Sequence, residues 1–123
     1  MQPTDLTRLS CEPCRGDTPP LTPQEAAQYL PLISSKWEVV DNLKLRRTFA
    51  HRNFLRARFF VNAVAYLAEQ EDHHPDITVS YSRVTLELTT HAIHGLSRND
   101  FIVAAKVDAL TAPRPVPVQE AAS

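Results

Sequence analysis

The first half of the chain contains a short helical pattern followed by two strand-like runs. Residues 22–25 read Thr-Pro-Gln-Glu, a capping box with proline at the first helical position, which predicts a helix that ends near Pro31. Residues 36–40 and 43–49 are strand-like, and the pair Asp41-Asn42 between them favours a turn. We therefore expect a helix followed by two adjacent strands.

A longer helical pattern comes next. Asn53 can cap a helix that runs through Glu69, with apolar residues at the helical period. The predicted apolar face consists of Phe54, Val61, Val64, Ala65 and Ala68. Further apolar residues, Phe59 among them, spread wider than one buried stripe needs, which is typical of an interface.

The second half of the core contains two alternating runs and a final helix. Apolar and polar residues alternate over residues 77–81 and 84–88, which predicts two strands joined by a tight hairpin at Ser82-Arg83. The sequence Ser-Arg-Asn-Asp at residues 97–100 resembles a capping box, and it predicts a helix over residues 101–110.

Prolines divide the chain into a regular centre and two ends. Six of the ten lie in the first 31 residues and three more lie between residues 113 and 117. Because proline interrupts helices and sheets, we expect a flexible arm over residues 1–20, one domain over 21–111 and a disordered tail over 112–123. The predicted element order is α-β-β-α-β-β-α. Strand pairs with one buried face need helical cover, so the pattern predicts a two-layer α+β sandwich on an antiparallel sheet.

Composition narrows the class of partner. The chain has 123 residues and a formal net charge of −1, which argues against a general nucleic-acid or anionic-membrane surface. Its most apolar stretch, residues 59–68, is too short to span a bilayer. Residues 1–10 have neither a basic start nor an apolar run, so we expect no secretory signal and a cytoplasmic protein.

The two cysteines, Cys11 and Cys14, have the Cys-x-x-Cys spacing. One such pair is half of a four-ligand zinc site, and the chain contains no second pair to complete it. The simplest interpretation is two reduced thiols in a flexible arm. A redox pair and a metal clip between chains remain alternatives.

Histidines form the candidate chemical site. Four of the five lie within 22 residues, near three carboxylates. The histidines are His73, His74, His91 and His94, and the carboxylates are Glu69, Asp72 and Asp100. In the predicted hairpin the third strand starts where the fourth finishes, so the neighbourhoods of His74 and His91 meet at one end of the sheet. Imidazoles and carboxylates together suit proton transfer near neutral pH.

Each of these residues also has a structural explanation. Asp100 can cap the final helix, and His73 or His74 can cap the end of the long helix. His94 is expected on a solvated loop before Gly95. A metal site is a weaker alternative, because adjacent histidines on an extended chain point to opposite faces. Trp37, taken alone, is typical of a core residue.

The cluster as a whole resembles a known signature. Its spaced residues are Glu69, His73-His74-Pro75, Tyr81, Thr89-Thr90-His91, Gly95-Leu96, Asp100-Phe101-Ile102 and Ala104-Ala105. With Trp37 and the aromatic-rich helix from Phe54, this pattern is similar to the pterin-4a-carbinolamine dehydratase family from Leu21 to Leu110. The leader around Cys11 and Cys14 resembles that of bacterial members.

The resemblance implies an activity and a set of site residues. Family members dehydrate 4a-hydroxytetrahydropterin to quinonoid dihydropterin, in the recycling of a pterin cofactor, by acid–base catalysis that needs no metal and no cofactor. By motif position, His73 and His91 resemble the acid–base pair, and His74 a residue that orients the pterin. Asp100 matches the active-site aspartate. The implied substrate-binding residues are Trp37, Glu69, Asp72, Thr89 and Thr90.

The resemblance also implies a fold, an assembly and alternatives. The implied fold is a four-stranded antiparallel sheet with three helices on one face, in a homodimer or homotetramer. Some relatives have a non-enzymatic role, either as dimerisation cofactors of a homeodomain transcription factor or as RuBisCO assembly factors. The histidines of the signature are present here, which favours the enzyme. A small metal-binding protein using His73, His74 and His91 is the third alternative.

Overall fold

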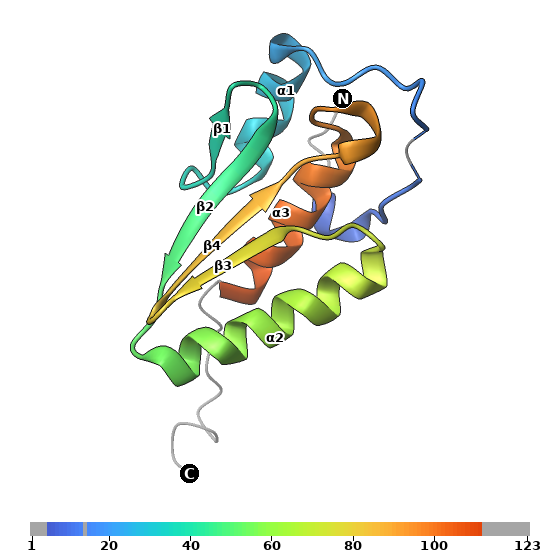
Figure 1. The fold of residues 1–123 in the computed structure, drawn as a ribbon. Coiled ribbons are helices and arrows are strands. Elements are labelled where there is room, and N and C mark those ends of the chain that lie inside the picture. The colour runs from blue at the N-terminus through green and yellow to red at the C-terminus, as the bar shows by residue number, and fades with distance from the viewer. Residues whose placement is uncertain (1–4, 14, 112–123) are drawn as a thin grey trace.

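The computed structural model describes residues 5–13 and 15–111. Within these residues the chain forms one four-stranded sheet in which every neighbouring pair is antiparallel (Figure 1). The strand order is β1-β2-β4-β3. The strands are β1 (Glu38–Val40), β2 (Lys44–Ala50), β3 (Asp76–Ser80) and β4 (Arg83–Leu88).

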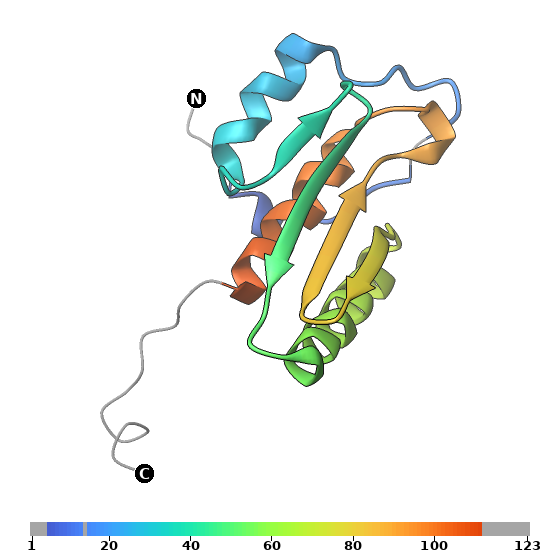
Figure 2. The same cartoon turned by 60° about the vertical axis from the view of Figure 1, so that its left-hand side comes forward.

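The same residues form three α-helices and three short 3-10 turns, which gives the predicted α+β class and element order. The α-helices are α1 (Pro23–Tyr29), α2 (Phe54–Glu71) and α3 (Arg98–Thr111), and the 3-10 turns are η1 (Leu6–Arg8), η2 (Leu30–Leu32) and η3 (His91–Ile93). Figure 2 shows the sheet in front, with α2 and α3 behind it. The buried sheet residues alternate along the strands: Leu45, Phe49, Val84, Leu86 and Leu88. Period-two alternation with one solvated face is what an antiparallel sheet covered on one side requires.

The buried face of helix α2 is rotated relative to the one predicted. Val64 and Ala68 are buried as expected and Val61 is half-buried against the core, but Phe54 and Ala65 are exposed, and Ala57 and Phe60 take their place. The reason is that apolar residues occur on almost every side of this helix, so periodicity alone does not select the face. Packing selects the buried face, because the small side chains of Ala57 and Ala68 allow the helix to lie close to the core.

The two hairpins differ in how well they follow prediction. Asp41 and Asn42 have φ of 53° and 55°, and the Leu43 N–H donates to the Val40 carbonyl at 2.8 Å, so this turn is confirmed. The second turn is at Tyr81-Ser82 rather than at Ser82-Arg83. Ser80 pairs with Arg83, which leaves Tyr81 at the tip with φ 52° and its side chain 73% exposed. The alternation of apolar and polar residues predicted Tyr81 as a strand residue, because an aromatic side chain at this position continues the pattern of Ile77 and Val79.

The N-terminal segment is the largest departure from expectation. Residues 5–13 lie along α3 instead of forming a loose arm, with Leu6 only 2% exposed in the core and η1 in contact with α3. This segment forms only the short turn η1, but the prolines near it do not prevent packing. Cys14 and residues 112–123 lie outside the described residues, so the predicted cysteine pair and tail have no structural account. In the described part of the chain, no helix has the length and apolar character needed to cross a membrane.

Candidate active site

A pocket of about 310 Å³ lies where the end of α2, the end of β4, η3 and the start of α3 meet. Six predicted site residues line it: Asp72, His73, His74, Thr89, Thr90 and His91. The structure therefore brings together residues that are up to 19 positions apart in the sequence, as the hairpin topology predicted.

The end of α2 sets the position of His73. Asp72 adopts the left-handed conformation (φ 52°, ψ 40°), and its N–H reaches the carbonyls of Ala68 and Glu69. The His73 N–H then donates to the Ala68 carbonyl at 3.2 Å. This is the hydrogen-bonding pattern by which helices commonly end, here with aspartate where glycine is usual. Asp72 therefore turns the chain so that His73 follows directly after the helix.

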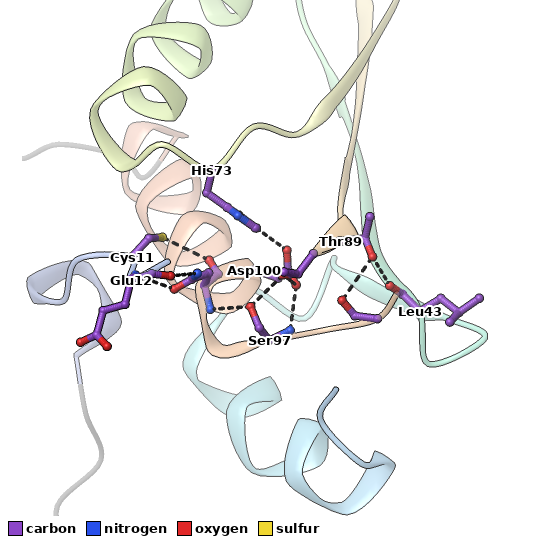
Figure 3. A network of polar contacts seen from close by, with 10 residues as sticks. Cys11, Glu12, Leu43, His73, Thr89, Ser97 and Asp100 are labelled. Carbon is purple, nitrogen blue, oxygen red and sulfur yellow. Dashed lines mark hydrogen bonds and ion pairs between the residues drawn. The ribbon is translucent and has the colours of Figure 1, made fainter. Parts of the chain in front are cut away.

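Asp100 is the buried centre of the site. Its side chain is fully buried and accepts from three donors (Figure 3). Oδ2 accepts the Ser97 N–H and the Thr90 hydroxyl, both at 2.9 Å, and Oδ1 lies 2.6 Å from His73 Nε2. The contact with Ser97 caps α3, which begins at Arg98 rather than at Phe101. One carboxylate thus fixes a helix start and a histidine ring at once.

The contact with Asp100 determines which nitrogen of His73 carries a proton. When Asp100 is ionised its carboxylate can only accept hydrogen bonds, and in that state the contact assigns the donated proton to Nε2. Nδ1 is then the nitrogen that can take up or release a proton. The His73 side chain is 11% exposed, so the ring is largely shielded but still reaches the pocket. This arrangement gives a histidine a fixed orientation for proton transfer.

The other two histidines of the pocket lie nearer to solvent. His74 is exposed, and its Nε2 lies 2.7 Å from Glu69 Oε1. His91 is exposed at the first position of η3. Glu69 does not line the pocket, but its side chain contacts the pocket residue His74 and its carbonyl accepts the N–H of the pocket residue Asp72. His94 is exposed, as expected of a solvated loop, and also lies outside the pocket lining.

The two threonines build the loop that carries His91. Thr89 Oγ1 donates to the Leu43 carbonyl at 2.6 Å, while the Thr90 N–H donates to the Gly95 carbonyl at 2.9 Å. Gly95 must be glycine here, because a Cβ at this position would lie 2.7 Å from Pro20 Cβ. The loop is therefore clamped between Leu43, just before β2, and Pro20.

Trp37 does not line the pocket. Its indole is buried in the core, with an edge-to-face contact to Phe49 and the Nε1–H donated to Asp108 at 2.7 Å. Asp108 also accepts from Arg47 at 2.7 Å. Within this single chain Trp37 joins β2 to α3, and the structure does not place it beside the histidines.

Five further residues line the pocket that the sequence did not identify as site residues. Cys11, Glu12, Pro13, Glu71 and Asn99 all line the pocket. Cys11, Glu12 and Pro13 belong to the leader that resembles that of bacterial family members, but no motif connects this leader with Glu71 and Asn99. The further sequence signals were the position of Glu71 two residues before His73 and that of Asn99 directly before Asp100.

Two of these residues have shifted pKa values. Burial, reinforced by the neighbouring Glu71 carboxylate, raises the pKa of the Cys11 thiol to about 12. Burial would also raise the pKa of Glu71, but hydrogen bonds from Lys106 and from the Cys11 N–H outweigh it and hold that pKa below its usual value. In the described residues, no three His, Cys, Asp or Glu side chains come together in a way that could hold a metal ion.

Comparison with known proteins gives a consistent relationship. A family model described as Pterin 4 alpha carbinolamine dehydratase matches residues 19–110. A Nitrosomonas eutropha protein named provisionally as a pterin-4-alpha-carbinolamine dehydratase is 50% identical over 106 residues, which cover 86% of this chain and 93% of that protein. A Methylococcus capsulatus protein with the same provisional name is 46% identical over 113 residues, covering 91% and 98%.

Two solved structures are similar in fold. One is a transcriptional coactivator/pterin dehydratase from Brucella melitensis, with a TM-score of 0.70 and 32% identity over 76% of this chain and 99% of that one. The other is a pterin dehydratase-like protein identified as a RuBisCO assembly factor in the α-carboxysome, with a TM-score of 0.55 and 27% identity over 64% and 93%. Since the family model spans most of the chain and relatives reach 50% identity, the protein belongs to the pterin-4a-carbinolamine dehydratase family.

Proposed function

We propose that the protein dehydrates 4a-hydroxytetrahydropterin to quinonoid dihydropterin by histidine acid–base catalysis. The observation that carries the proposal is the 2.6 Å contact between His73 Nε2 and the buried Asp100, at a pocket that His74 and His91 also line. Family membership supplies the substrate class.

The chemistry requires two proton transfers and no other reagent. The C4a–O bond breaks, and the departing hydroxyl takes a proton from an acid to leave as water. The N5–H bond gives its proton to a base, and its electrons form the C4a=N5 double bond. Imidazole can serve as either acid or base near neutral pH, and such catalysis typically contributes about 10²–10⁴-fold.

The three histidines are proposed to differ in role because their surroundings differ. His73 is held by Asp100 and shielded, so it is suited to exchange a proton through Nδ1. His91, on the clamped loop, is proposed as its acid–base partner. His74 is exposed and paired with Glu69, and we assign it to binding and orienting the pterin. Thr89, Thr90 and Asp72 complete the walls, and Asp100 is a positioning residue.

A stopped-flow assay with chemically generated 4a-hydroxytetrahydropterin tests the proposal. We expect the purified protein to accelerate loss of the substrate, and to keep that activity after exhaustive dialysis against a chelator, because every proposed step is a proton transfer. Activity that disappears on chelation and returns with zinc would contradict acid–base catalysis without metal. No acceleration at all would favour a binding role instead, since one relative of similar fold is identified as a RuBisCO assembly factor.

We further propose that the chain self-associates through the outer face of α2. Leu55, Phe59 and Tyr66 are more than half exposed, and their spacing places them on one stripe opposite the buried residues of the helix. Exposed apolar side chains in a continuous stripe are typical of a protein–protein interface.

Light scattering of the purified protein tests the assembly. We expect a mass that is a multiple of the 13.8 kDa chain, reduced to a smaller species by Leu55→Glu with Phe59→Glu, because both charges would have to be buried in the interface. Lys36→Glu, on an exposed residue of a different segment, serves as the control and should not change the mass. A wild-type protein that is monomeric at every concentration tested would rule out the interface.

A further inference from the structure

One wall of the pocket comes from outside the region that the family model matches. The model starts at residue 19, whereas Cys11, Glu12 and Pro13 line the pocket beside Asp72, His73 and His91. These three residues, Cys11–Pro13, are called the N-terminal wall below. They lie within the arm that the sequence alone predicts to be flexible, so something must hold them in place.

Asn99 holds the N-terminal wall from the side of α3. Its Oδ1 accepts the Glu12 N–H at 3.0 Å and its Nδ2 donates to the Glu12 carbonyl at 2.5 Å (Figure 3). A side-chain amide that binds both main-chain groups of one residue imitates the pairing of a β-strand. Asn99 is itself buried although Glu12 is exposed, so these bonds are partly shielded from competition with water.

Glu71 holds the same wall from the side of α2. Its Oε1 accepts the Cys11 N–H at 2.9 Å, and its Oε2 is 2.5 Å from Lys106 Nζ. The lysine and the carboxylate are both largely buried, with side-chain exposures of 16% and 10%. Both anchors bind main-chain atoms of the wall, and the Cys11 thiol also donates to the Asn99 carbonyl at 3.6 Å, so Asn99 and Glu71 together fix its position.

The anchors share their elements with the proposed acid–base site. Asn99 directly precedes Asp100 at the start of α3, and Glu71 lies two residues before His73 at the end of α2. We propose that Asn99 and Glu71 are positioning residues that fix the N-terminal wall as one side of the pterin pocket. The inference rests on the proposed function, because it assigns the wall to that same substrate.

The wall is expected to act on binding more than on chemistry. Its main-chain hydrogen bonds run to Asn99 and Glu71, whereas His73 is held by Asp100, and the wall bounds the pocket that the substrate fills. Freeing the wall would widen the pocket without moving the proton-transfer groups. We therefore expect Asn99→Ala to raise KM roughly tenfold, the effect of losing about one net hydrogen bond, and to leave kcat within about threefold.

Arg98→Ala is the matched control for this variant. Arg98 is the neighbouring residue and contacts the wall through an exposed ion pair, at 3.5 Å from Glu12 Oε2. Exposed pairs contribute little, so KM should stay near that of the wild type. If Asn99→Ala lowered kcat and left KM unchanged, or if both variants behaved alike, the wall would not be a binding element.

The Cys11 thiol gives a second measurement that needs no turnover. In a Cys14→Ser background, its reaction with iodoacetamide is expected to be slow, because burial raises the pKa of the thiol and keeps it protonated. Asn99→Ala should speed this reaction about tenfold or more, by exposing the thiol and returning its pKa toward the ordinary 9.0. A saturating stable dihydropterin should slow the reaction in both proteins.

The two measurements separate failure of this inference from failure of the proposed function. Binding of dihydropterin can be followed by fluorescence. If the protein bound dihydropterin without protecting Cys11 from alkylation, the wall would not be part of the pocket. An unchanged alkylation rate in Asn99→Ala would show that Asn99 is not an anchor. A wild type that neither turns over the substrate nor binds dihydropterin would overturn the proposed function, and with it the pterin assignment of the wall.

Discussion

Replacing His73 or His91 by alanine is expected to lower kcat by about 10²–10⁴-fold, the usual contribution of one acid–base group. The expected change in KM is less than about threefold, because the proton transfers occur after the substrate has bound. For His73 the reason is geometric: Asp100 fixes Nε2 as the protonated nitrogen, and no other ring at the pocket has a buried carboxylate partner among the described residues.

Two further histidines provide matched controls. His94→Ala removes an exposed imidazole outside the pocket lining and should leave both constants near those of the wild type. His74→Ala removes a proposed binding contact and should act largely through KM. Steady-state constants for all four variants, with circular dichroism to establish folding, make the comparison.

The double variant of His73 and His91 tests whether they act as one unit. Groups that share a proton-transfer step are not additive, so its loss should be smaller than the product of the two single losses. Normal turnover in both single variants would remove the acid–base assignment and favour a non-enzymatic role for the pocket. A fully multiplicative double variant would instead mean that the two rings serve independent steps.

Much of the fold could be predicted because local signals and topology agree in this chain. The capping box at residues 22–25 and the Asp41-Asn42 turn both have local hydrogen bonds that their residue types favour, and both are present. The buried face of α2 could not be derived this way. A helix with apolar residues on several sides acquires its orientation from the surface it packs against.

The candidate site was predictable on one side only. His73, His74 and His91 meet because a hairpin returns the chain to the same end of the sheet, and this follows from element order alone. The N-terminal wall follows from no periodicity, since Glu71 and Asn99 hold the main chain of residues that lie 60 and 87 positions away. For Trp37 the motif suggested a residue at the edge of the pocket. In the structure its indole N–H instead donates to Asp108 within the core, which is the role that the residue type alone indicates.

Asp100 is expected to give the largest effect on stability of any residue in the site. Asp100→Ala leaves the Ser97 N–H, the Thr90 hydroxyl and His73 Nε2–H without this acceptor, and it also removes the cap of α3. Each buried donor that is left without an acceptor typically costs about 1–3 kcal/mol, so with three donors affected we expect the free energy of unfolding to fall by several kcal/mol. Urea denaturation measures it, with Asp17→Ala, an exposed aspartate, as the control.

Asp100→Asn separates the structural role of this residue from its effect on His73. An asparagine can keep its oxygen toward Ser97 and Thr90, so the cap survives and the loss of stability should be about 1 kcal/mol. Its NH₂ group then faces His73 Nε2 and favours the tautomer protonated at Nδ1, which removes the acceptor that the proposed reaction needs. We expect kcat to fall about 10²-fold or more in a folded protein. If Asp100→Asn instead turned over like the wild type, Asp100 would be a helix cap only, and the orientation of His73 would have no part in the reaction.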